Sequence, residues 1–257
     1  MKSFGRKGLV AAMSLVLFTA VFSSFPAFAS WSLGLTGKYK YDDASRYNVG
    51  SVSIEEPING IDISWVAGDV EIEYWDGSTL EVSETFRTKS SDDALLRWRI
   101  KNGRLYIKYA KSNFSTKNVD KDLLVRIPRG LVLRDVEVET VSADTTLSIQ
   151  ADSFDFESVS GNLKAQMDYV KEVDLETVSG EISLSLGVSP REIDGSSVSG
   201  SFDITLPKDA LYAVEFDSVS GRLRSSSANL SGGASYNPKG AYSRFEFETV
   251  SGDVSIN

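Results

Sequence analysis

Residues 173–184 read VDLETVSGEISL, and this stretch decides the fold. Two alternating apolar residues, Val173 and Leu175, precede a Thr-Val-Ser-Gly corner, and Ile182 and Leu184 follow it in the same alternation. Alternate residues of a strand point to the same face, so all four side chains face one interior. Ser and Gly are typical turn residues. The segment therefore predicts two short strands that meet at a corner and share an apolar interior.

Nearly the same unit occurs six times in the second half of the chain. The central valines are spaced by 18, 19, 20, 21 and 31 residues, and they are Val141, Val159, Val178, Val198, Val219 and Val250. A diverged seventh copy runs from Ile61 to Tyr74. A period near 20 residues predicts stacked coils that each pack on their neighbours. We therefore predict an all-β protein: a β-solenoid, β-helix-like stack of ~20-residue two-strand coils with a more irregular N-terminal β region.

Three features of the copies carry further expectations. The corner glycine, Gly180 in the third copy, is expected to have a positive φ, which other residues adopt only at a cost. The central valine has the opposite parity to the apolar residues before it, so it packs inside the corner or forms an exposed stripe, and we favour the inside position. Ala143 and Thr145 indicate an altered first coil, and Gly195 replaces an interior apolar residue in the fourth.

Between and beyond the copies the pattern changes. Residues 95–109 predict a hairpin around Asn102-Gly103, a strong turn signal, and residues 123–127 predict another strand. Residues 225–243 form a polar loop before the last copy, which ends in the strand 254–256. Unpaired backbone groups on such a last strand favour further pairing. We therefore expect this edge either to be covered by an earlier segment, such as the polar loop, or to mediate self-association.

The N-terminal residues have the features of an export signal. Lys2, Arg6 and Lys7 precede an apolar run, and Ala27-Phe28-Ala29 is a small-x-small cleavage site. A membrane anchor is the alternative, although the apolar run is shorter than the ~20 residues of a spanning helix. The predicted organisation is a signal peptide at 1–29, a spacer at 30–50 and one β-repeat domain at 51–257. That domain divides into an irregular part, 51–130, and the regular repeats, 131–257.

Composition excludes several classes of protein. The chain has no histidine and no cysteine, which excludes His-assisted serine or cysteine hydrolases and disulfides. An exported chain without disulfides is typical of the bacterial envelope, so we expect a periplasmic, cell-surface or extracellular location. Removing residues 1–29 takes away three of the 27 basic residues and none of the 36 acids, which leaves a net charge of −12. Such an acidic chain is a poor binder of nucleic acid.

Acidic residues follow the repeat. An acid stands two positions before most of the valines, namely Glu139, Glu157, Glu176, Asp217 and Glu248, with Ser196 as the exception. On stacked coils these residues form a column of like charges, which either faces solvent or binds a divalent cation. The first interpretation is preferred, because the repeat pattern of calcium-binding β-rolls is absent. The Ser and Thr residues beside the valines are expected to form corner hydrogen bonds. No metal site, cofactor or catalytic set is predicted.

Basic residues gather in one segment. Residues 97–134 contain eleven Lys and Arg against two Asp. In the predicted hairpin the basic residues alternate with apolar ones, which gives one basic face, formed by Arg97, Arg99, Lys101, Arg104 and Lys108. This face is the candidate binding site for an anionic envelope polymer, a phospholipid head group or an acidic protein. The alternative is a face that pairs with the acidic columns of the same chain or simply faces water.

The repeated unit, together with the Ile-x-Ile-x-Trp-x-x-Gly-x-Val motif of residues 61–70 and the segment 125–130, resembles a bacterial family of exported β-strand-repeat proteins described as adhesins. The resemblance covers residues 51–257. It implies a β-repeat fold and a surface role, and it brings no catalytic residues. We therefore expect a non-enzymatic exported protein that binds or displays at the envelope. The alternative is a carbohydrate-active solenoid enzyme with paired carboxylates, which would cluster in one groove and break the repeat.

Overall fold

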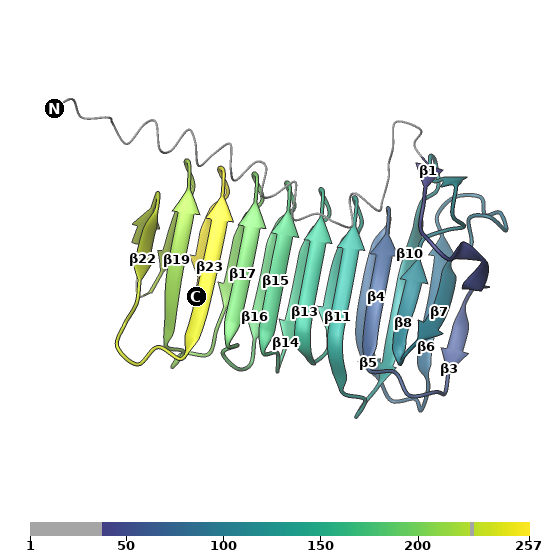
Figure 1. Ribbon diagram of the computed structural model, residues 1–257, viewed down its shortest axis with the longest axis horizontal. Helices are drawn as coiled ribbons and strands as arrows, with labels where there is room; N and C mark the ends of the chain where they lie inside the picture. Colours follow the sequence, from purple (N-terminus) through teal and green to yellow (C-terminus); the bar gives the residue numbers. More distant parts are fainter. Residues whose placement is uncertain (1–37, 227–228) are drawn as a thin grey trace.

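A computed structural model gives the structure of residues 38–226 and 229–257. Over these residues the chain forms two eleven-stranded sheets and one small two-stranded sheet. The strands stand side by side along the long axis of the molecule (Figure 1). The predicted all-β, solenoid-like fold is confirmed, and none of the described residues belongs to an apolar helix of membrane-spanning length. The predicted signal peptide and residues 30–37 of the predicted spacer lie outside the described residues.

Each coil contributes one strand to each large sheet. The first sheet has the order β2 (Asn48–Val49), β7 (Arg97–Lys101), β8 (Arg104–Lys108), β4 (Gly60–Trp65), β11 (Leu133–Thr140), β13 (Ala151–Ser158), β15 (Glu172–Thr177), β17 (Glu192–Ser197), β23 (Ser243–Thr249), β19 (Tyr212–Ser218) and β22 (Ala234–Tyr236). The second sheet has the order β21 (Asn229–Ser231), β20 (Arg222–Ser225), β24 (Val254–Ile256), β18 (Phe202–Thr205), β16 (Ile182–Leu186), β14 (Leu163–Met167), β12 (Asp144–Ser148), β5 (Asp69–Trp75), β10 (Lys121–Pro128), β6 (Leu80–Phe86) and β3 (Val52–Ile54). The small sheet pairs β1 (Lys38–Tyr39) with β9 (Phe114–Ser115).

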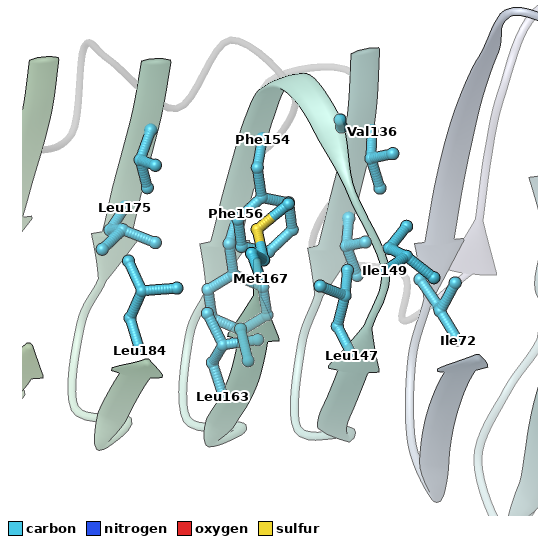
Figure 2. Packing of buried hydrophobic residues seen from close by; sticks show 14 of the residues in the cluster. Ile72, Val136, Leu147, Ile149, Phe154, Phe156, Leu163, Met167, Leu175 and Leu184 are labelled. Atoms are coloured by element: carbon cyan, nitrogen blue, oxygen red, sulfur yellow. The ribbon is translucent and has the colours of Figure 1, made fainter. Parts of the chain in front are cut away.

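The apolar core lies between the two large sheets. Parallel pairing in register places Leu175 of β15 beside Phe156 of β13, and both side chains are buried. Figure 2 shows them above Leu163 and Leu184, which come from the second sheet. Each such side chain contributes roughly 1.5 to 3 kcal/mol when it is buried. The interior positions predicted from alternation are therefore confirmed, and a coil is stable only when its neighbours cover it.

The corner of each coil is built differently from the sequence-based expectation. Gly180 does not have a positive φ, and among the repeat corners only Gly68 of the diverged copy does. Glycine is required for another reason: a Cβ on Gly180 would overlap the carbonyl oxygen of Gly161 in the preceding coil. The hydroxyl of Thr177 accepts a hydrogen bond from the Gly180 amide at 2.8 Å, and Ser179 donates to the Val159 carbonyl at 3.2 Å. These bonds confirm the structural role predicted for the Ser and Thr columns.

The central valines lie between the two positions considered for them. Val159 and Val178 are half-buried, so the inside position holds only in part. The corner turns the side chain out of the core, and the neighbouring coils then cover it from two sides. Val219 is 43% exposed. Its coil is the outermost one that carries this corner, so a neighbouring corner covers the valine on one side only. The valines therefore form a partly covered stripe along the corner edge.

The last copy of the repeat does not lie at the end of the stack. Strand β23 is inserted between β17 and β19 (Figure 1). In the second sheet, β24 is inserted between β18 and β20. Of the two outcomes expected for this edge, the structure shows the covered one, because β24 has a paired strand on each side. The covering segment comes earlier in the chain, as expected, but it is the preceding copy. The polar loop instead forms β21 and β22, which cover the outer edges of β20 and β19.

Gly195 explains how the inserted coil fits. It lies directly beside Phe247 of β23 in the parallel register. A Cβ on Gly195 would lie 2.5 Å from the Phe247 ring, so the ring occupies the space that the missing side chain leaves. Phe247 also packs against Phe202, with ring centroids 5.4 Å apart. The apolar residue that is missing from the fourth copy is thus supplied by the last one.

The N-terminal part extends the same two sheets. The diverged copy forms β4 and β5 in register with β11 and β12, and the predicted hairpin forms β7 and β8, so both predictions are confirmed. Residues 38–50, expected to belong to a spacer, instead pack onto this region. Strand β1 pairs with β9, the short helix η1 (Ala44–Arg46) follows, and β2 pairs with β7. Tyr39 is buried and packs edge-on against Tyr109, which holds the segment in place.

Lys121 is the largest departure from the surface expected of the basic segment. Its side chain is fully buried, and its ammonium pairs with Glu84 at 2.5 Å and donates to the carbonyl of Ala94 at 2.7 Å. The ammonium also lies 4.7 Å from the centre of the Trp65 ring. Burial lowers the pKa of Lys121 to about 8, although Glu84 opposes this shift. The ion pair joins the start of β10 to β6 in the interior.

Candidate functional site

The outer face of the first sheet carries two rows of acids, which we call the acidic face. In-register pairing places one residue of each row on each successive coil. The first row is Asp62, Glu137, Asp155, Asp174, Asp194, Glu246 and Glu215, and the second is Glu139, Glu157, Glu176, Ser196, Glu248 and Asp217. Neighbouring residues of a row are separated by the strand spacing of ~4.8 Å. The sequence predicted the second row, whereas the first became visible only with the pairing.

The electrostatics of this face follow from burial and like charge. Burial, reinforced by the neighbouring Glu139 and Glu176, raises the pKa of Glu157 to about 8. Burial and the charge of Asp174 raise the pKa of Glu176 to about 7. One carboxylate oxygen of each of these two glutamates is buried without a hydrogen-bond partner. Among the described residues, acidic side chains do not converge in groups of three or more that could hold a metal ion.

The raised pKa values predict that the protein is more stable in mild acid than in base. A group whose pKa is higher in the folded state stabilises the fold fully below its unfolded pKa, and this contribution is lost as the pH rises through the folded value. For Glu157 that window runs from the usual glutamate value of 4.5 to about 8. We expect the thermal midpoint to fall by about 3 °C or more between the two ends of this window, as for a loss of ~1 kcal/mol. Calorimetry across this range measures it.

Two matched substitutions test whether Glu157 itself causes the pH dependence of stability or whether the loss of any acidic charge has the same effect. Glu157→Gln is expected to raise the midpoint at the basic end and to flatten the pH dependence, because it removes one of the stacked charges. Glu181→Gln is the control, since Glu181 is exposed and lies outside the acidic face. A midpoint that rises with pH in the unsubstituted protein, or equal effects of the two substitutions, would contradict the assignment.

The five basic residues predicted as a binding site take different places. Arg97 is buried, and its guanidinium donates to the carbonyl of Asp92 at 2.9 Å. Arg104 pairs with Asp135 and with Glu137, the latter at 3.0 Å. Lys108 pairs with Asp62 at 3.0 Å and donates to the Ser64 hydroxyl at 2.6 Å. Lys101 is exposed at the end of β7. For Arg104 and Lys108 the structure therefore agrees with the alternative, in which the basic face pairs with acids of the same chain.

Arg99 is the predicted residue that faces an open site. Its guanidinium carbon lies 4.6 Å from the centre of the Tyr47 ring and 5.1 Å from that of Tyr106. One terminal nitrogen, Nη1, donates to Asp43 at 3.3 Å. Within the described part of the chain, this is the sole hydrogen bond of the guanidinium. The planar cation thus lies against two aromatic rings, and among the described residues its buried Nε has no partner and its terminal Nη2 is unused.

Arg99 lines a cleft of about 580 Å³, which we call the aromatic cleft. The cleft lies between residues 40–47 and the hairpin β7–β8. Tyr41 and Tyr47 pack edge to face, with centroids 5.0 Å apart, and burial raises the pKa of both to about 12, so both phenols keep their protons. The lining residues are Lys40, Tyr41, Asp42, Tyr47, Asp62, Arg99, Tyr106, Lys108, Ser112 and Asn113.

Sequence reasoning missed half of this cleft. Tyr41 and Tyr47 belong to the segment interpreted as a spacer, in which no strand or helix period is visible. A local signal existed, because three tyrosines fall within residues 39–47. Aromatic residues at that density rarely remain in water, and they usually pack against another surface.

The repeat architecture is also visible in comparisons with known proteins. The sequence pattern of the family Toastrack DUF4097 matches residues 58–189 of the 257-residue chain. The chain belongs to the Toastrack family. Members of this family have a β-solenoid-like fold, in agreement with the two stacked sheets. No curated protein matches this Toastrack chain.

Several solved structures are similar to this Toastrack protein. A candidate cell adhesion protein from Clostridium sporogenes has 12% identity and a TM-score of 0.44, with 82% of this chain and 98% of that chain covered. A candidate adhesin from Bacteroides fragilis has 14% identity and a TM-score of 0.47, with 82% and 97% covered. A candidate lipid binding protein from Parabacteroides distasonis has 13% identity and a TM-score of 0.39, with 82% and 97% covered.

Proposed function

We propose that this Toastrack protein is a non-enzymatic, exported scaffold of the cell envelope, adhesin-like in role, which binds an anionic envelope polymer in the aromatic cleft. The observation that carries the proposal is Arg99, a cation that lies against Tyr47 and Tyr106 with its Nη2 unused. The solenoid supplies a rigid support, because the cleft is anchored to β4, β7 and β8 of one continuous sheet. Export is expected from the N-terminal signal features of the sequence.

The chemistry of the cleft favours an anionic ligand with flat apolar faces. Lys40, Arg99 and Lys108 line it together with two acids, Asp42 and Asp62. Lys108 and Asp62 neutralise each other, and Asp43 is shared by Arg99 and Arg46. One cation is therefore in excess when Asp43 and Arg46 are counted with the lining residues. Tyrosine rings offer apolar surface for stacking, while the hydroxyls of Tyr47 and Tyr106 and the side chains of the remaining polar residues can bond hydroxyl groups. The volume lies within the range of ~300 to 1,000 Å³ of small-ligand sites.

The carboxylates do not favour the enzyme alternative. A glycosidase needs two carboxyl groups set apart in a groove. Here the acids with raised pKa values continue along the sheet from coil to coil, so no pair is distinguished from the rest. The depression beside Glu157 and Glu176 measures about 170 Å³, which is smaller than a sugar-binding groove requires. The repeated acids therefore support a scaffold rather than a reaction centre.

Titration calorimetry with two probes tests the proposal. Oligogalacturonate presents carboxylates on sugar rings, and poly(glycerol phosphate) presents phosphates without rings. We expect oligogalacturonate to bind, and Arg99→Gln to weaken it at least about tenfold, as for the loss of a hydrogen bond to a charged group. Affinity should fall as salt rises, because exposed charges are screened.

Lys101→Gln is the matched control, since Lys101 is a basic residue of the same hairpin that does not line the cleft. It should change the affinity by less than twofold. If poly(glycerol phosphate) binds more tightly than oligogalacturonate, the proposed ligand would be a phosphate polymer instead of a polymer of acidic sugar rings. Absence of binding to both probes, or equal effects of the two substitutions, would overturn the proposed site, and hydrolysis of oligogalacturonate would overturn the non-enzymatic assignment.

A further inference from the structure

Exposed apolar side chains gather along one edge of the solenoid, opposite the valine corners. Seven large hydrophobic side chains of the described residues are exposed, and four of them lie in the loops that lead from the second sheet into the first. A fifth, Tyr242, lies in the loop from β22 to β23, beside the loop that carries Leu211. We call these loops the loop edge. The five residues and their exposed fractions are Val132 (73%), Tyr169 (38%), Val188 (42%), Tyr242 (77%) and Leu211 (45%).

Each of these loops, with the first residues of the strand that follows, also carries an exposed cation. Arg129, Lys171, Arg191 and Arg244 have side-chain exposures of 66%, 53%, 61% and 62%, and Lys208 is exposed as well. Four of the five cations pair with an acid of a neighbouring strand or turn. Such exposed pairs contribute about 0 to 1 kcal/mol, so a competing phosphate can replace them. One apolar tip and one cation therefore recur in five of the six loops that lead into the strands from β11 to β19, and the loop into β13 carries neither.

The stacking places the apolar tips nearly in line. The loops leave the lower ends of the strands along the long axis of the molecule (Figure 1). The amide of Tyr242 donates to the carbonyl of Leu211 at 3.2 Å, which shows that these two loops are direct neighbours. From Val132 to Leu211 there are five strand steps of ~4.8 Å, or about 24 Å in all. A line of that length with shallow apolar tips matches a flat surface better than a pocket.

The acidic face does not oppose contact of this edge with an anionic surface. Asp174, in the nearer row of the acidic face, lies three residues beyond Lys171 along β15, which is about 10 Å at ~3.3 Å per residue, and Glu176 lies about 16 Å away. Both distances exceed the Debye length of ~8 Å at physiological salt. The charges nearest the edge are the recurring cations, the acids that they pair with, and the exposed Asp168 and Asp209, which lie next to Tyr169 and Lys208. A second copy of the same edge would bring cation against cation, which disfavours a dimer through it.

We propose that the loop edge lies on a phospholipid bilayer, with Tyr169, Tyr242 and Leu211 among the head groups and the loop cations on the phosphates. Tyrosine, leucine and valine tips supply apolar contact, and Lys and Arg side chains beside them keep their charges in water at the phosphate level. Each cation adds about 1 kcal/mol on an anionic leaflet. Contact through a few tips without deep insertion makes the binding reversible. This inference is independent of the aromatic cleft.

Single-cysteine labelling tests the orientation. The chain has no cysteine, so one introduced residue carries the label alone. Tyr242→Cys and Val219→Cys, each labelled with an environment-sensitive fluorophore, report the loop edge and the opposite corner edge. Vesicles of phosphatidylglycerol and phosphatidylethanolamine should increase the emission at position 242 at least twofold and leave position 219 unchanged. Equal responses at the two positions, or none at position 242, would overturn the proposal.

Co-sedimentation with the same vesicles tests the residues. The triple variant Tyr169→Ser, Leu211→Ser and Tyr242→Ser should lose most of the bound fraction, whereas Val219→Ser and Lys101→Gln should bind as the unsubstituted protein does. Vesicles of phosphatidylcholine alone should bind several-fold less protein, because they lack net negative charge. All substituted positions are exposed or outside the core, and circular dichroism verifies the fold. Unchanged sedimentation of the triple variant would refute the role of the loop edge.

Discussion

Replacing Gly180 with alanine is expected to destabilise the protein by roughly 3 kcal/mol or more, and valine at the same position to prevent folding. The added Cβ would overlap the carbonyl oxygen of Gly161, which belongs to the backbone of the preceding coil. Neither strand can move away, since β15 is paired with β13 on one side and with β17 on the other. Urea unfolding of the two variants measures the loss.

The alanine variant distinguishes the two explanations for this glycine. A requirement for positive φ would cost about 1 to 2 kcal/mol with alanine, whereas a backbone overlap makes alanine nearly as damaging as valine. Ser179→Ala is the control at the same corner. It removes only the hydroxyl that donates to Val159 and should cost about 1 kcal/mol. Gly180→Ala with a stability close to that of Ser179→Ala would show that the coils are not packed as closely as the structure has them.

The coils themselves could be predicted from the sequence because their information is local. Alternation assigns Val173, Leu175, Ile182 and Leu184 to the interior, and the constant position of the corner fixes the register between copies. The same pattern revealed that the corner requires a small residue. It did not reveal the reason, since the oxygen that excludes a side chain belongs to another coil about 20 residues away.

Contacts between residues far apart in the chain could not be predicted from the sequence, for a related reason. Lys121 appeared to be one more surface cation, because its partners Glu84 and Ala94 lie 37 and 27 residues away in strands and turns without a repeat. Tyr41 and Tyr47 belong to a segment with no period, and their contacts are made with the hairpin. The basic hairpin was predicted, but its ion pairs were not. The acids that pair with Arg104 come from β11, a strand about 30 residues further along the chain that approaches the hairpin only in the folded sheet.

The position of the last coil left one trace in the sequence. Gly195 is the only interior position of its copy that lacks a side chain, and the last copy has two phenylalanines, Phe245 and Phe247, at its interior positions. In the folded chain Gly195 and Phe247 are register partners. A cavity in one copy and a large residue in another are thus a signal of spatial adjacency between copies that are not consecutive.

This complementarity gives the second prediction with a large effect. Phe247→Ala should cost about 3 to 5 kcal/mol, because it removes a fully buried ring. Gly195→Val should destabilise the protein by roughly 3 kcal/mol, because the new side chain would meet the Phe247 ring, 2.5 Å from the position of its Cβ. The double variant should be more stable than the sum of the two losses predicts, by about 1 to 3 kcal/mol.

The two single substitutions lower the stability through the same part of the core, which is left empty by Phe247→Ala and is overfilled by Gly195→Val. A valine at position 195 partly fills the volume that the ring leaves, and this shared volume is what couples the two substitutions. Equilibrium unfolding of all four proteins gives the coupling free energy, and Phe245→Ala in place of Phe247→Ala is the control, since Phe245 pairs with Ile193 instead of Gly195. Strict additivity for the Gly195 and Phe247 pair would mean that the last coil does not lie beside the fourth. In that case β23 would occupy the end of the stack, and its outer edge would again be free to pair with another chain.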